Sequence, residues 1–261
     1  MNKKIKFIII SAILGIAFFL FLFLPMESRY LSLLAGVFLV SFCYWFGLGV
    51  VFETGWFNKI ALIILPSGLF VGLGLLAMLF LQNFWLMLAF SLFFGILCYV
   101  IFLVDNVFMV AIGFKTVPLY RAAYTVSLIL TMLMSFLLFN NLYSYKVEFY
   151  WNFVGVFVIS ILIFWYQFWS IAIELADDGK SKNVYDYVLV PSLLIGELAL
   201  ALSFWPVGIF KASILLVSGV YIISGLIQAD VKDTLHKRVW NQFGLMGLAI
   251  ILAILFITPW G

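Results

Sequence analysis

Glu197 is the residue whose type and position most clearly point to chemistry. It lies near the middle of an apolar run at residues 186–206. A charge at the centre of a membrane-spanning helix costs roughly 2.5–3.5 kcal/mol on insertion scales, so such a residue is protonated, paired or directed at a polar cavity. We expect Glu197 to bind substrate, a proton or a cation, or to act as an acid or base; a structural role, as a neutral acid hydrogen-bonded between helices, is equally open. Its expected partners on nearby spans are Ser41, Thr131, Ser160, Gln167 and Ser203.

A second group of charged residues lies at the ends of the apolar runs. Acids and arginines at one depth can form ion pairs that close the inner side of a cavity, as a transport gate does. The simpler interpretation is ordinary helix-end charge, which we favour because exposed ion pairs contribute little. The single histidine, His236, lies nearby, and we expect no metal or cofactor, because metal sites need several ligands. The group consists of Glu53, Asp105, Arg121, Glu174, Asp230 and Arg238.

The composition defines the class of protein in which these residues sit. Of 261 residues, 67% are hydrophobic and 10% are charged, whereas soluble domains carry roughly a quarter charged residues. The apolar runs are continuous over about twenty residues, which is the length that crosses a ~30 Å hydrocarbon layer as a helix. Strands of a membrane barrel would alternate apolar and polar residues instead. The sequence therefore predicts an all-α, polytopic integral membrane protein, and its small, scattered net charge of +3 predicts no nucleic-acid partner.

The connections between the runs predict about nine transmembrane helices. With the N-terminus in the cytoplasm, eleven of the 14 Lys and Arg residues fall in cytoplasmic connections, as the positive-inside rule requires. Residues 105–118 have too short an apolar core to cross, so they either lie in the interface or extend the fourth span. The predicted spans are residues 7–25, 30–52, 60–82, 85–104, 119–139, 151–173, 186–206, 209–229 and 241–259.

Two stretches of the chain resemble each other in order. Residues 36–41 (GVFLVS) match residues 155–160 (GVFVIS), and in both halves a proline lies early in the next span. We interpret this as a parallel duplication of four spans about an axis along the membrane normal; chance similarity between apolar segments is the rival explanation. The predicted organisation is an N-terminal anchor helix at 1–29, a first four-helix unit at 30–140 and a second at 141–261, all in one continuous membrane domain.

The two proline-containing spans also carry small residues at helical spacing. Small residues four apart let two helices approach closely, and a proline can kink a helix. Tight packing is the interpretation we favour. The functional alternative is that both helices line a substrate site between the halves. The residues concerned are Pro66, Gly68, Gly72, Pro191 and Gly196.

These features favour a carrier or flippase-like protein for a small solute or lipid, located in the cell membrane. One alternative is a non-catalytic membrane subunit that scaffolds a partner within the bilayer. A second is a membrane enzyme acting on lipid-linked substrates, with its site among Asp105, Glu174, Asp230 and His236. We favour a non-enzyme, because the sequence has no metalloprotease, serine-hydrolase or nucleotide-binding motif. The expected partners are membrane lipids and another membrane protein.

Overall fold

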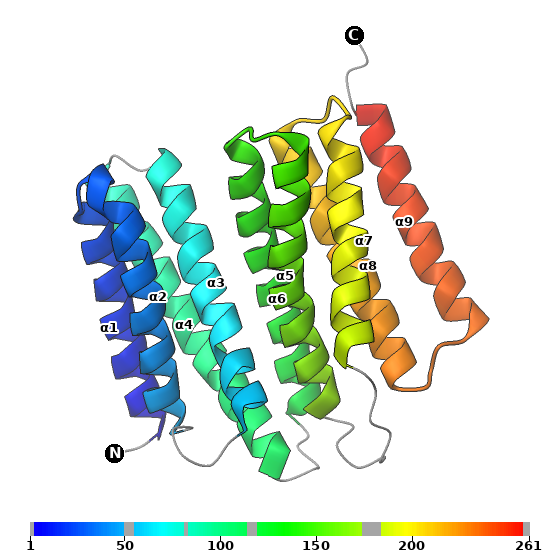
Figure 1. The fold of residues 1–261 in the computed structure, drawn as a ribbon. Coiled ribbons are helices and arrows are strands. Elements are labelled where there is room, and N and C mark those ends of the chain that lie inside the picture. The colour runs from blue at the N-terminus through cyan, green and yellow to red at the C-terminus, as the bar shows by residue number, and fades with distance from the viewer. Residues whose placement is uncertain (1–2, 50–54, 81–82, 114–118, 174–183, 258–261) are drawn as a thin grey trace. The chain divides into compact units, whose positions relative to one another are not determined.

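The computed structural model describes residues 3–49, 55–80, 83–113, 119–173 and 184–257. Within these ranges the chain forms nine α-helices and no strand (Figure 1). The helices are α1 (Lys3–Phe23), α2 (Met26–Leu48), α3 (Trp56–Phe80), α4 (Phe84–Gly113), α5 (Tyr120–Ser144), α6 (Phe149–Ala172), α7 (Val184–Ser203), α8 (Ile209–Val231) and α9 (Lys237–Ile257).

All nine helices of the described ranges are long and apolar enough to cross a membrane. The prediction of an all-α, polytopic membrane protein with about nine spans is therefore confirmed. The cytoplasmic location of the N-terminus and the internal duplication stay predictions, because helix length and composition carry no information on either.

The turn between the first two helices falls earlier than predicted. We expected the second span to start at residue 30, but α2 begins at Met26, directly after Pro25. The reason is that Arg29 is not a solvated loop residue. Its Nε donates to the Leu24 carbonyl at 2.7 Å and its Nη2 to the Leu22 carbonyl at 2.9 Å. The guanidinium thus satisfies carbonyl groups at the end of α1 that no helical N–H can reach.

The fourth helix resolves the two alternatives for residues 105–118. α4 has 30 residues and continues through Asp105 to Gly113. The described part of this segment therefore extends the fourth span and does not form a separate interfacial turn. At a rise of 1.5 Å per residue, a helix of this length spans about 45 Å, more than the hydrocarbon layer requires.

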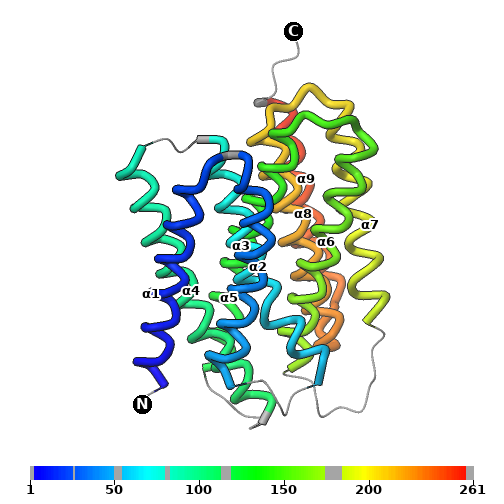
Figure 2. The backbone as a smooth tube through the Cα atoms, turned by 60° about the vertical axis from the view of Figure 1, so that its left-hand side comes forward, coloured from blue at the N-terminus to red at the C-terminus, as the bar shows by residue number. Residues whose placement is uncertain are grey.

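The chain divides into two units by its internal contacts: residues 1–130 form unit 1 and residues 131–261 form unit 2. In unit 1, α1 packs against α4 and α2, and α3 packs against α2 and α4 (Figure 2). Its core is aromatic. The Phe102 ring stacks on Tyr44, with centroids 4.0 Å apart, and on Phe7 at 5.2 Å. Phe18 is fully buried and its ring lies 4.8 Å from that of Phe94.

Helices α1 and α4 approach each other at small residues. A Cβ added to Gly15 would lie 3.4 Å from the Ser91 carbonyl oxygen and 3.5 Å from the Gly95 Cα. A Cβ added to Gly95 would lie 3.4 Å from the Ser11 carbonyl oxygen. Ser11 and Gly15 thus face Gly95 and Ser91 reciprocally, as two antiparallel small-x-x-x-small motifs. This contact was not predicted, since the first span was taken as an anchor helix.

In unit 2, α6 packs against α7 and α8, and α8 also packs against α7 and α9. Its close contacts join a small residue on one helix to an apolar side chain on the next. A Cβ added to Gly155 on α6 would lie 2.8 Å from the Leu142 side chain of α5. A Cβ added to Gly225 on α8 would lie 2.4 Å from the Phe243 ring of α9. Glycine at these positions is what allows the neighbouring side chains to pack.

The boundary between the contact units lies ten residues before the predicted one. It falls within α5, after Leu130, whereas the predicted repeat units meet after residue 140. Contacts within a unit do not test whether the two halves arose by duplication, so the 4+4 organisation stays a prediction.

Candidate functional site

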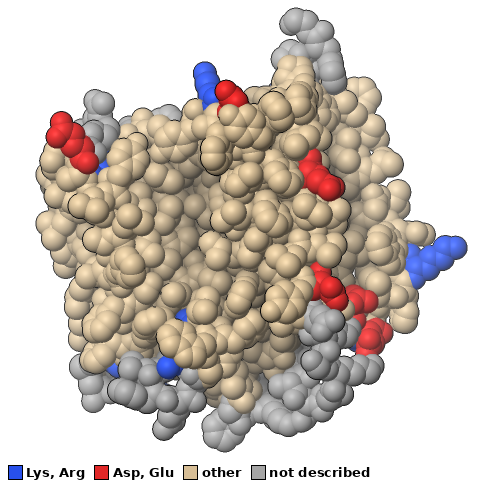
Figure 3. All heavy atoms as spheres, viewed as in Figure 1, with Lys and Arg blue, Asp and Glu red and all other residues tan. Residues whose placement is uncertain are grey.

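Glu197 lies on the exposed face of α7. The buried face of that helix carries Val188, Ser192, Ile195 and Ala199, and a residue two positions after Ile195 points the opposite way in an α-helix. Charged side chains are sparse on the face drawn in Figure 3, and most of them lie toward helix ends. A carboxyl group inside a spanning helix, here six residues before the last residue of α7, is therefore an exception that needs a polar neighbour outside the packing face of α7.

The expected partners of Glu197 are either buried or hydrogen-bonded to other groups. Thr131, Ser160 and Gln167 are fully buried. Ser41 is buried in unit 1, where its hydroxyl donates to the Val37 carbonyl at 2.8 Å. Ser203 is a hydrogen-bond partner of Asn152.

The predicted gate residues are distributed over both units. Asp105 is fully buried in α4, and neither carboxylate oxygen has a hydrogen-bond partner within the described ranges. Arg121 is exposed at the start of α5, in the same unit. In unit 2, Arg238 and His236 are exposed near the start of α9. Glu53 and Glu174 lie outside the described residues.

One gate residue takes part in a defined contact, although not with an arginine. Tyr187 of α7 donates a hydrogen bond to Oδ2 of Asp230 on α8, with the two oxygens 2.5 Å apart. The Tyr187 ring also stacks on Phe168 of α6 at 5.4 Å. The Tyr187–Asp230 pair therefore joins α6, α7 and α8 near the end of the unit where α6 ends and α7 begins. We call it the Tyr187–Asp230 clasp.

A second polar contact lies at the opposite end of the same helices. Asn152, at the start of α6, donates through Nδ2 to Oγ of Ser203, at the end of α7, at 3.2 Å. The Ala199 carbonyl accepts from the Ser203 hydroxyl at 3.0 Å and from the Tyr143 hydroxyl of α5 at 2.9 Å. We call this the Asn152–Ser203 clasp. It joins α5, α6 and α7.

Between the two clasps, unit 2 contains buried polar groups that lack partners. Ser160 lies about two turns beyond Asn152 on α6, and Gln167 lies about two turns further. Both are fully buried, and the Ser160 hydroxyl and both polar atoms of the Gln167 amide have no hydrogen-bond partner among the described residues. Ser224, on the neighbouring helix α8, is also fully buried, and its hydroxyl has no hydrogen-bond partner among the described residues. We call these three residues the polar core of unit 2.

An unsatisfied buried amide or hydroxyl is costly, by roughly 1–3 kcal/mol for each group. Ser and Gln inside spanning segments usually hydrogen-bond to a neighbouring helix, so three that lack such a partner are candidates for holding a ligand. The amide of Gln167 can both donate and accept, so the polar core suits a ligand with hydrogen-bonding groups of both kinds. The sequence named Ser160 and Gln167 only as partners for Glu197, and Ser224 and the two clasps were missed. The signal for Ser224 was a hydroxyl deep in an apolar run.

The prolines and glycines of the proline-containing spans lie where helices pack. Pro66 in α3 and Pro191 in α7 are both buried within their helices. A Cβ added to Gly196 would lie 3.1 Å from the Phe153 ring and 3.3 Å from Cβ of Phe157, both on α6. Gly196 therefore permits close packing of α6 on α7. Gly68 is half-buried and Gly72 buried in α3.

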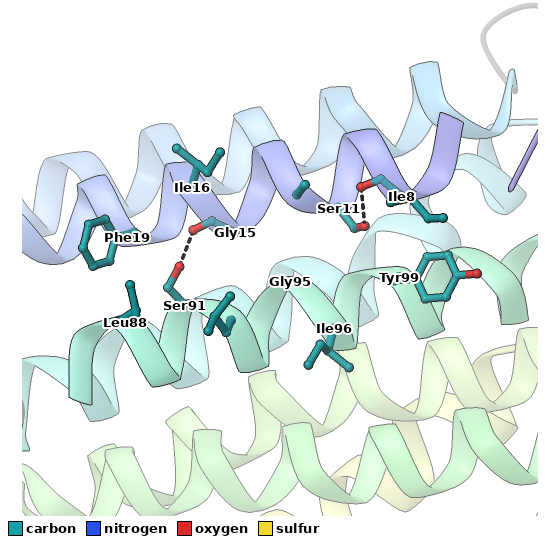
Figure 4. Close-up of a pocket in the computed structure, with 12 residues that line it drawn as sticks. Ile8, Ser11, Gly15, Ile16, Phe19, Leu88, Ser91, Gly95, Ile96 and Tyr99 are labelled. Atoms are coloured by element: carbon teal, nitrogen blue, oxygen red, sulfur yellow. Dashed lines mark hydrogen bonds between the residues drawn. The ribbon is translucent and has the colours of Figure 1, made fainter. Parts of the chain in front are cut away.

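An open apolar groove of about 480 Å³ runs between α1 and α4 in unit 1. Figure 4 shows its floor, where the Ser91 hydroxyl donates to the Gly15 carbonyl at 2.6 Å and the Ser11 hydroxyl donates to the Ile8 carbonyl at 3.0 Å. Both serine hydroxyls are satisfied, and Tyr99 supplies the other polar side-chain group of the lining, so the groove surface is mostly apolar. A second apolar groove lies between α8 and α9. Glu197 lines neither groove. Among the described residues, no three His, Cys, Asp or Glu side chains are placed to hold a metal ion.

The nine long apolar helices of the described ranges define a polytopic helical membrane protein. Residues 52–257, which run from just before α3 to the end of α9, match the family model described as a protein of unknown function, DUF5656, and the chain belongs to this family. No curated protein and no solved structure matches the chain.

Proposed function

We propose that the protein is a carrier of small, uncharged polar solutes and that unit 2 holds the solute. The observation that carries the proposal is the Gln167 amide, which is fully buried in a spanning helix with both of its polar atoms unpartnered among the described residues. A solute that hydrogen-bonds to this amide and to the hydroxyls of Ser160 and Ser224 would remove the cost of burying them.

The two clasps supply the closures that a carrier needs on either side of its binding site. The Tyr187–Asp230 clasp joins helices at one end of unit 2, and the Asn152–Ser203 clasp joins them at the other. Hydrogen bonds of this kind are each worth about 1 kcal/mol net, so they can break and reform during a transport cycle. With the predicted orientation, the first clasp faces the cytoplasm and the second faces outward, in the cell membrane.

The chemistry of the polar core favours a neutral solute over a phosphate-bearing lipid. None of the buried polar side chains in the described part of unit 2 is charged. A phosphate group would need Lys, Arg or a helix N-terminus aimed at it. A solute with hydroxyl or amide groups needs only donors and acceptors, which the core supplies.

The test is solute flux into proteoliposomes, followed by light scattering as the vesicles reswell in glycerol or urea. We expect vesicles with the native protein to reswell several-fold faster than empty ones, and Gln167→Leu to remove most of the gain. The matched control is Gln242→Leu, the same replacement on the exposed face of α9, which should keep the native rate. Reswelling no faster than in empty vesicles, or native rates in the Gln167→Leu protein, would contradict the proposal.

The alternative of a non-catalytic subunit draws on a different observation. Helix α9 packs against α8 and leaves most of its surface exposed, including Leu245 at 68% and Phe256 at 87%. Such a surface can contact lipid or another membrane protein. Co-purification of a second membrane protein in mild detergent, lost on Leu245→Arg, would favour the subunit. The enzyme alternative gains no support, because Asp230 is tied to Tyr187 and His236 lies exposed.

A further inference from the structure

The exposed face of α7 carries a regular row of side chains centred on Glu197. Val190 is 54% exposed, Leu194 is 49% exposed and Phe204, just past the helix end, is 68% exposed. Leu193 and Leu200 are exposed on the same side. We call this row the α7 seam. It lies opposite the face by which α7 packs within unit 2.

The spacing along the α7 seam is that of a helix–helix interface. Val190, Glu197 and Phe204 are seven residues apart, and leucines occupy the positions midway between them. A repeat of this length keeps one stripe of a helix facing a partner helix, and a single polar residue in such a stripe fixes the partner and the register. A face that met only lipid tails would need neither the repeat nor the carboxyl group.

A second copy of the same chain fits the seam best. Two copies in one membrane have the same orientation, so a two-fold axis along the membrane normal places their α7 helices parallel and brings a residue near the axis against itself. A protonated carboxyl has one O–H donor and free acceptor capacity, so it can pair with an identical group. No cation at that depth is needed, and the described Lys and Arg side chains of unit 2 lie near helix ends or in connections.

We propose that the protein self-associates through the α7 seam, with the Glu197 carboxyl groups of two copies hydrogen-bonded to each other. Each carboxyl is then covered by its counterpart instead of by hydrocarbon. The flanking leucines, Val190 and Phe204 interdigitate above and below. This interface is separate from the polar core of unit 2, so its failure and that of the carrier proposal are distinguishable.

The first measurement is the association of fluorescently labelled copies in proteoliposomes, followed by energy transfer as the protein is diluted with lipid. We expect Glu197→Leu to weaken association at least tenfold, because it removes the paired groups while keeping an apolar side chain that folds readily in the bilayer. Glu197→Gln, which still donates and accepts, should retain most of it. Gln242→Leu on α9 is the control and should associate as the native protein does.

The second measurement locates the contact by disulfide formation, with Cys43 and Cys98 replaced by alanine. Leu200→Cys on the seam should crosslink two copies, whereas Ile214→Cys on α8 should not. The two sites have similar exposure, at 36% and 39%. Native-like association of Glu197→Leu, or equal crosslinking at the two sites, would overturn the proposal. So would a monomeric native protein that instead binds a different membrane protein through Glu197.

Discussion

Unit 1 and unit 2 are both helical membrane bundles, but their interiors differ in how many polar side chains they bury. In unit 1, stacked rings such as Phe102 on Tyr44, and the Gly15–Gly95 approach, fill the space between helices. Unit 2 also packs apolar side chains between its helices, but its described residues include more buried hydrogen-bonding side chains than those of unit 1, and the polar core leaves several of them unsatisfied. Since lipid tails are as apolar as a protein core, packing rather than water exclusion holds such bundles together. Unit 1 is thus held mainly by packing, with the buried Asp105 carboxyl, unpartnered among the described residues, as its exception, whereas unit 2 retains several groups that cost stability.

Removing an aromatic ring from unit 1 should have the largest effect. Phe102 is fully buried between two rings, so Phe102→Ala should lower the free energy of unfolding by about 3 kcal/mol through the cavity it leaves. Unfolding in bicelles, followed by steric trapping, measures this. The control is Phe42→Ala, at a site 68% exposed, and equal losses at the two sites would show that aromatic packing is not what stabilises unit 1.

Enlarging the contact between α1 and α4 should have the next largest effect. Gly15→Leu should cost about 2 kcal/mol, because the helices must move apart to admit the side chain. Gly15→Ala should keep or raise stability, by up to about 1 kcal/mol, because alanine is the better helix former and its Cβ would lie at ordinary contact distances of 3.4 and 3.5 Å. The same unfolding measurement distinguishes the two. Unchanged stability in Gly15→Leu would mean that the close approach of α1 and α4 is not needed for the packing of unit 1.

Unit 2 should respond to an apolar replacement with the opposite sign. Gln167→Leu should raise the free energy of unfolding by about 1 kcal/mol, because it removes a buried amide with no partner. The same variant should lose solute flux, so stability and activity move in opposite directions. Thermal unfolding of the purified variant beside Gln242→Leu tests the first part. A clear destabilisation would mean that the Gln167 amide is paired in the folded protein, which would contradict the proposed difference between the two units.

Loosening a clasp should have the smallest effect on stability. Tyr187→Phe removes the hydrogen bond to Asp230 and should cost about 0.5–1 kcal/mol. Under the carrier proposal it should also speed glycerol entry, because one closure of the pathway is weakened. Tyr221→Phe, a partly exposed site on α8, is the control for loss of a phenol. Slower entry in Tyr187→Phe would contradict the assigned role of the clasp.

Much of the fold was predictable from the sequence, because apolar runs long enough to cross a bilayer are unambiguous. The helix ends were less so. Arg29 was predicted to lie in a loop, since no sequence pattern indicates that its guanidinium folds back onto the carbonyls of α1. The sequence likewise did not locate the end of α4, because a charged residue such as Asp105 does not by itself end a helix.

The direction in which each span faces was not predictable, and this is why the site was only partly anticipated. In water an apolar stripe identifies the buried face of a helix, but in lipid both faces are apolar. The depth of Glu197 could be counted from the ends of its run, yet nothing in the hydropathy told whether it pointed inward. The small residues Ser192 and Gly196 on α7 were the usable signal, because small residues favour helix contacts and both lie on its packing face.

The most direct test of the contrast between the units is whether water reaches the polar core. With Cys43 and Cys98 replaced by alanine, a single cysteine is introduced as Gln167→Cys or as Phe102→Cys, and vesicles are treated with iodoacetamide, a small neutral thiol reagent. We predict modification at position 167, slowed when a transported solute is present, and none at position 102 while the protein stays folded. Equal protection of both positions would contradict this prediction.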